Sequence, residues 1–117
     1  MELEDRLPQS LKCLVKRVAH HVSPGIEDVI DGQLTLARIA RGGATMIDLD
    51  VPETAPRVAL PDGPLPVRSI VHDPEGHAVG EILVWIRDGR LVALEQARFT
   101  ADPPVGWPEV DDVTMTT

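Results

Sequence analysis

The sequence predicts an α+β domain in which one or two N-terminal helices pack on an antiparallel β-sheet of four to five strands. Three observations lead to this fold class. Apolar residues recur at helical spacing before residue 23, and they alternate with polar residues after Gly32. An Asp-Gly pair also separates two long apolar segments near the C-terminus. The first pattern is typical of an amphipathic helix, and the other two are typical of strands joined by tight turns.

The first expected element is a helix that ends before Ser23-Pro24-Gly25. Its apolar residues fall at i, i+3, i+4, i+7 and i+11 and therefore share one stripe: Leu11, Leu14, Val15, Val18 and Val22. Ser23 is a good N-cap and Pro24 suits a first helical position, so a second, short helix is expected after them.

Residues 34–51 are expected to form a hairpin, because Ile47, Leu49 and Val51 alternate with polar residues on the presumed wet face. Asp48 and Asp50 share that face and could bind a cation, but a solvated face is the favoured interpretation. Residues 34–41 fit either a strand or a helix, and the sequence leaves both open. Five prolines between residues 52 and 66 then predict an extended loop with apolar anchors.

The C-terminal part is expected to be a three-strand meander over residues 67–72, 79–87 and 90–100. Asp88-Gly89 predicts a two-residue type I′ turn, which fixes the register by counting outward from it. Trp85 then faces Val92, and Ile82 faces Glu95. We expect residues 1–102 to form a single α+β domain, and residues 103–117 to form a Pro-rich extended tail with a frayed end.

Both faces of this meander are predicted to be apolar. One carries Ile82, Val84, Ile86, Leu91 and Ala93, and the other carries Trp85, Leu83, Val92 and Leu94. A helix with one apolar stripe covers only one face, and soluble monomers rarely leave a patch of this size bare. The Trp85 face is therefore expected to lie under the Pro-rich loop and the Trp107 tail or against a second copy, and a homodimer is favoured.

Few residues suggest chemistry. In the counted register Glu95 lies on an apolar face, where burial favours the protonated form and where it could act as a general acid or base. The favoured interpretation is a structural carboxylate near a sheet end that hydrogen-bonds a loop backbone or an arginine. His72, Asp73, Glu75 and His77 surround one turn, but a solvated turn is expected rather than a metal site. The two histidines are not expected to converge with Asp73 or Glu75 on a common point, and no cofactor is predicted. Cys13 is expected to be a buried structural thiol.

The net charge of −8 disfavours nucleic acid and anionic membranes as partners. The only cysteine, Cys13, suits a reducing compartment, and the acidic start MELEDRLPQS is unlike a signal peptide, so a cytoplasmic location is expected. Nine Arg against two Lys, with no Asn, is typical of a GC-rich bacterial genome.

Residues 79–108 contain the pattern G-E-hydrophobic-x-W-x-x-D-G-x-L-x-x-L-E, which runs from Gly80 and Glu81 through Trp85 to Leu94 and Glu95 and precedes a Pro-rich segment. In this last third the chain resembles small uncharacterised actinobacterial proteins. The resemblance implies no known activity.

These observations favour a non-enzymatic binding protein, immunity-like or regulatory, that acts through its sheet or acidic surface, with a basic protein as a possible partner. The alternative is a small-molecule binding or hydrolytic domain with Glu95 in a pocket. A deep cleft that holds Glu95 beside a second titratable group would favour the alternative.

Overall fold

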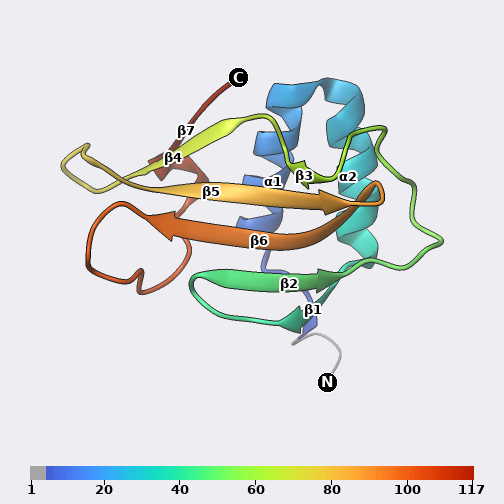
Figure 1. Cartoon of the computed structure of the whole chain (residues 1–117), viewed down its shortest axis with the longest axis horizontal. Helices are drawn as coiled ribbons and strands as arrows, with labels where there is room; N and C mark the ends of the chain where they lie inside the picture. The colour runs from blue at the N-terminus through green and yellow to red at the C-terminus, as the bar shows by residue number, and fades with distance from the viewer. Residues whose placement is uncertain (1–4) are drawn as a thin grey trace.

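A computed structural model describes residues 5–117 of the chain. Within these residues, two helices pack on one face of a seven-stranded sheet whose paired strands are all antiparallel (Figure 1). The α+β class is confirmed, with both helices present. The expected count of four to five strands is too low, because short strands form in the proline-rich loop and at the C-terminus.

The helices follow the apolar stripe seen in the sequence. α1 (Gln9–Val22) buries Leu11, Leu14, Val15 and Val18 against the sheet. α2 (Pro24–Leu36) begins at the expected cap, where the Ile26 N–H donates to Ser23 Oγ at 3.1 Å. It is longer than expected. Residues 34–36 end the helix and Arg38–Arg41 form a strand, so each of the two options for 34–41 holds for part of the segment.

The sheet has the order β1-β2-β6-β5-β4-β7, and β3 also pairs with β5. β4, β5 and β6 form the expected C-terminal meander, and the two helices lie behind the sheet in Figure 1. The strands are β1 (Arg38–Arg41), β2 (Met46–Asp50), β3 (Gly63–Pro64), β4 (Arg68–His72), β5 (Ala78–Arg87), β6 (Arg90–Arg98) and β7 (Val113–Thr116).

The C-terminal end of the chain is ordered into the sheet, which corrects the expectation that it frays. After an extended proline-rich stretch, a 3₁₀ turn at Val110–Asp112 leads into β7, which pairs with β4 from Arg68 to Val71. Val113 is buried in the same core as the helices. The residues after 102 are therefore packed onto the domain.

The Asp88-Gly89 turn is confirmed, with φ of 54° at Asp88 and 74° at Gly89. The register counted from it is wrong beyond the first pair. Ile86 pairs with Leu91 as expected, but Trp85 pairs with Ala93, because Val92 is an extra residue in a β-bulge. Glu95 consequently pairs with Leu83 instead of Ile82.

The bulge moves residues of β6 between the two faces, since a slip of one residue inverts every later side chain. Leu94 was predicted to lie on the Trp85 face and is instead 1% exposed in the core. Glu95 was predicted to share a face with Val84 and lies on the opposite one, beside Trp85. The face against the helices contains Ile82, Val84, Ile86, Leu91 and Leu94, all of them buried.

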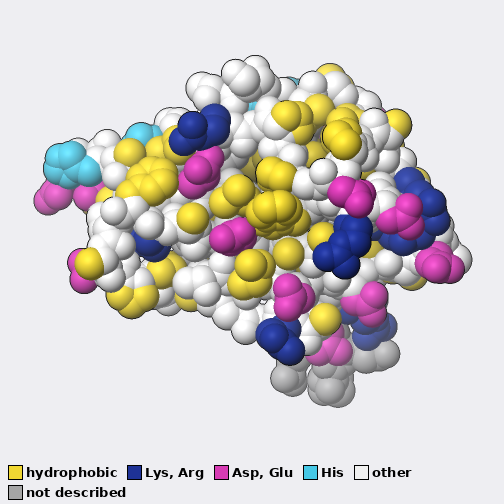
Figure 2. Space-filling view, in the orientation of Figure 1, with side chains coloured by type: hydrophobic (Ala, Val, Ile, Leu, Met, Phe, Trp, Pro, Cys, Tyr) yellow, Lys and Arg dark blue, Asp and Glu magenta, His cyan; other side chains and the backbone are white. Residues whose placement is uncertain are grey.

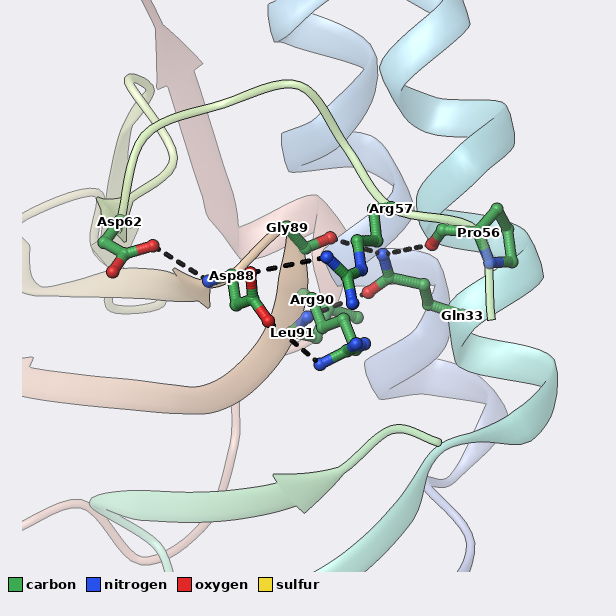
Figure 3. A network of polar contacts seen from close by, with 8 residues as sticks. All are labelled: Gln33, Pro56, Arg57, Asp62, Asp88, Gly89, Arg90 and Leu91. Carbon is green, nitrogen blue, oxygen red and sulfur yellow. Dashed lines mark hydrogen bonds and ion pairs between the residues drawn. The ribbon is translucent and has the colours of Figure 1, made fainter. Parts of the chain in front are cut away.

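A buried glutamine joins α2 to the hairpin turn (Figure 3). The Gln33 side chain is 0% exposed, and its amide Nε2 donates to the carbonyl oxygens of Pro56 and Gly89, both at 2.8 Å. Its Oε1 accepts from the Leu91 N–H at 2.8 Å. One side chain thus fixes the turn and the proline-rich loop against the helix.

Replacing Gly89 by alanine is expected to lower the free energy of unfolding by more than about 2 kcal/mol, since a positive φ alone costs an L residue about 1–2 kcal/mol. The added Cβ would also lie 2.8 Å from Arg57 Cβ and 2.9 Å from the Val58 carbonyl oxygen. Gly76→Ala is the matched control, because Gly76 also has a positive φ but has no atom within 4 Å of a built Cβ. Urea unfolding measures both, and equal losses would show that the contact with residues 57 and 58 is unimportant.

Gln33→Met is expected to destabilise the fold by about 3 kcal/mol, because it leaves the buried Leu91 N–H and the Pro56 carbonyl without their partner. Methionine keeps the length of the side chain, so little of the loss comes from packing. Thr35→Ala, an exposed change on the same helix, is the control and should stay within about 0.5 kcal/mol. A Gln33→Met variant as stable as the parent in thermal and urea unfolding would contradict this role.

Candidate functional site

The face of the sheet away from the helices carries an apolar centre with charged side chains around it. Figure 2 shows this face, with hydrophobic side chains gathered over the middle of the sheet and acidic ones next to them. Leu83, Trp85, Val92 and Ala93 are half-buried here, and Met46 is 39% exposed. Trp85, Leu83 and Val92 therefore lie on the outer face, as predicted, although Leu94 does not.

Neither the helices nor the C-terminal segment covers this outer face. Trp107 packs at the edge of the core, and its indole N–H donates to the Gly43 carbonyl at 2.8 Å. The neighbouring Gly106 carbonyl accepts from the buried amide of Gln96. The proline-rich loop borders the face through β3, which pairs with Trp85 and Ile86. The loop therefore forms a rim. Trp107 packs elsewhere, while Thr117 at the end of the C-terminal segment lines a smaller hollow beside Leu83.

An open groove of about 500 Å³ runs across this face. It lies over a cross-strand row in which Asp48 of β2 pairs with Ala93 of β6, and Ala93 pairs with Trp85 of β5. The small alanine between two larger side chains leaves the hollow. The groove is lined by Met46, Asp48, Asp62, Gly63, Trp85, Ile86, Arg87, Val92, Ala93 and Glu95.

Trp85 and Glu95 form a hydrogen-bonded pair in this groove. The indole Nε1–H donates to Glu95 Oε1 at 3.0 Å across the β5–β6 ladder. The bond fixes the plane of the ring and satisfies the one polar group that a half-buried tryptophan carries. Glu95 is thus a hydrogen-bonded carboxylate, but its partner is the Trp85 indole and not the loop backbone or the arginine that the sequence led us to expect.

The groove offers three carboxylates and one guanidinium: Asp48, Asp62 and Glu95 against Arg87. Asp62 is partly used, since its Oδ1 accepts from the Asp88 N–H at 2.8 Å. No histidine, serine, threonine, cysteine or lysine is among the described lining residues, so the three carboxylates are the only groups of this lining that could serve as a nucleophile or a base. Its chemistry suits binding of a cationic or amphipathic group.

The Asp73–His77 turn differs from its prediction. His72 stays apart, bonded to the Gly76 carbonyl and to Thr114 Oγ1. Asp73, Glu75 and His77, however, converge, with ligand atoms within 4.8 Å of one another, whereas no convergence was expected. The Asp73 carboxylate already accepts the Glu75 and His77 backbone N–H groups, at 3.0 and 2.9 Å, and closes the turn. That this turn binds no metal stays a prediction.

Two further candidate residues, Cys13 and His20, lie on the helices and not in the outer groove. Cys13, expected to be buried, is exposed on α1, where the Gln9 amide lies 3.8 Å from its sulfur. His20 pairs with Glu27 at 3.0 Å and links the end of α1 to the start of α2. Within residues 5–117 no helix is both long and apolar enough to cross a membrane.

No protein-family model, curated protein or solved structure matches the chain significantly. The similarity of residues 79–108 to small actinobacterial proteins therefore stays a prediction. The evidence for function therefore comes from the groove and its lining residues.

The pKa of Asp73 is lowered from 3.8, chiefly because the His77 backbone N–H donates to its carboxylate. A group whose pKa falls on folding stabilises the fold above its unfolded pKa of about 3.9, and this contribution is lost as the pH falls through the folded value. We therefore expect Asp73→Asn to weaken the fold near neutral pH and to flatten its acid sensitivity below about pH 4. Glu75→Gln, in the same turn, is the control. A carboxyl carbon NMR titration of Asp73 with a midpoint at or above about 3.9 would contradict the assignment.

Proposed function

We propose that the protein is a non-enzymatic binding protein that docks another protein on the outer face of its sheet. One observation carries this proposal. Trp85, Leu83 and Val92 form an apolar centre that no helix or C-terminal segment among residues 5–117 covers, and carboxylates surround it. Aromatic side chains at the centre of a patch with a polar rim are characteristic of protein interfaces.

The charge of this face favours a basic partner. Asp48, Asp62 and Glu95 outnumber Arg87 in the groove, and the whole chain carries a net charge of −8. Complementary charge steers association and selects the partner. An immunity-like or regulatory protein that neutralises a basic protein in a reducing compartment fits this description.

A hydrolytic role for Glu95 has less support. A carboxylic acid that transfers protons must lie beside the reacting group in a site that excludes water. Glu95 does share its groove with other titratable side chains, Asp48 and Asp62 among them, but the groove is open and not deep, and Glu95 accepts the Trp85 indole N–H. The observation favours recognition over catalysis.

Met46→Arg places a positive charge on the exposed rim of the outer face and is expected to reduce capture of the partner by tenfold or more, about 1.4 kcal/mol. Ser10→Arg adds the same charge on the exposed surface of α1 and is the control. Affinity capture from the organism that encodes the chain, quantified by mass spectrometry, compares the two variants with the parent. Basic proteins lost only with Met46→Arg would support the proposal. Equal capture by both variants would contradict it.

Light scattering of the purified chain tests the homodimer predicted from the sequence. A dimer that Met46→Arg dissociates and Ser10→Arg preserves would assign the outer face to a second copy of the chain. A monomer at micromolar concentration would leave the face free for a different protein.

A further inference from the structure

The floor of the groove has the width of one extended side chain. Asp48, Ala93 and Trp85 lie side by side on three neighbouring strands. Strands are about 4.8 Å apart, so the outer two residues of this row lie about 10 Å from each other across the alanine methyl group. A long, unbranched side chain fits between them over Ala93.

Two walls of the groove attract a cation. Trp85 contributes an aromatic ring to the groove lining, and cations prefer the face of tryptophan to that of the other aromatic side chains. Its indole N–H is already used by Glu95, whose negative charge stays next to the ring. Opposite, Asp48 is half-buried and has no hydrogen bond or ion pair within the described part of the chain, so its carboxylate is available.

We propose that this groove binds an arginine side chain of the basic partner, with the guanidinium over Trp85 and between the carboxylates of Asp48 and Glu95. The inference rests on the proposed function and specifies its anchor. Arginine suits the site better than lysine because its planar group both stacks on an aromatic ring and donates to carboxylates in a fixed fork.

A second copy of the chain suits the groove less well. Pairing two outer faces about a two-fold axis would bring two sets of three carboxylates together with only two guanidinium groups to balance them. Like charges at such an interface oppose association. A basic partner has the complementary charge.

The probe is N-acetyl-arginine amide, with N-acetyl-citrulline amide as its neutral isostere. Each is titrated into the ¹⁵N-labelled chain while the Trp85 indole N–H resonance, assigned with Trp85→Phe, is followed by NMR. The arginine amide is expected to shift this resonance saturably and to bind about tenfold more tightly than the citrulline amide. Equal binding of both amides, or no shift with either, would overturn the proposal.

Two variants locate the bound cation. Ala93→Leu fills the floor without changing any charge and is expected to abolish the shift. Asp48→Asn keeps the shape and is expected to weaken binding about threefold, as for a solvent-accessible ion pair. Asp50→Asn, on the same strand but outside the groove lining, is the matched control and should bind like the parent. If Ala93→Leu does not fold, the other two variants decide. Weaker binding of the arginine amide by Asp48→Asn but not by Asp50→Asn supports the site, and identical binding by these two variants refutes it.

The outcome is separable from that of the proposed function. If Met46→Arg reduces partner capture but the arginine amide does not shift the Trp85 indole N–H resonance, the docking face is supported and the arginine anchor is refuted. Amide binding with capture that ignores Met46→Arg would keep the groove and refute the docking face. A Trp85 shift that follows protein concentration alone would assign the groove to a second copy and overturn the arginine proposal.

Discussion

The three hydrogen bonds of the Gln33 side chain are the interaction on which the arrangement of the sheet depends. The bonds to Gly89 and Leu91 are buried and the bond to Pro56 is partly buried, and a polar group that loses its partner in the interior costs its full desolvation. Through Gly89 and Leu91 they hold the start of β6 against α2, and through Pro56 they hold the loop that leads to Asp62 and β3. The same network extends outward, where Asp88 lies between Arg57 and Arg90 (Figure 3). Arg90 lowers the stability that this network provides, because two of its buried nitrogens have no hydrogen-bond partner within residues 5–117.

From that fixed turn, a single extra residue decides which side chains reach the outer face. The bulge at Val92 turns Glu95 outward and Gln96 inward. A charged carboxylate in the core would need a paired cation, whereas an amide needs only hydrogen bonds. Gln96 finds them in the carbonyl oxygens of Ala44 and Gly106, at 2.9 and 3.0 Å. The bulge therefore places the Trp85–Glu95 pair in the groove and fastens the C-terminal segment on the other side.

The elements with a strong local signal could be predicted from the sequence. Helical spacing located α1, the Ser23 cap located the start of α2, and Asp88-Gly89 located the turn. The bulge could not be predicted from the sequence. Residues 91–94 are all apolar, so the register with the bulge and the register without it both leave two apolar faces. The order of Glu95 and Gln96 was the available signal, since a straight ladder would bury the charge and expose the amide. The sequence offered a pocket at Glu95 as an alternative, but the straight register did not place Trp85 and Glu95 in one groove. Asp48 was considered as a cation ligand, and a solvated face was favoured for it.

The outer face could associate with a second copy of the chain or with a different, basic protein, and its composition affects these two associations differently. Burying Trp85 and Leu83 against any surface removes apolar area from water, which favours contact with a second copy as much as with another protein. The surrounding carboxylates distinguish the two, because they repel an identical face and attract a basic one. Salt screens both effects over about 10 Å at 0.1 M ionic strength, so it weakens the attraction and relieves the repulsion. At low ionic strength the face therefore discriminates most strongly, and Asp48, whose charge is not paired within the described chain, contributes to that discrimination without contributing an ion pair to the fold.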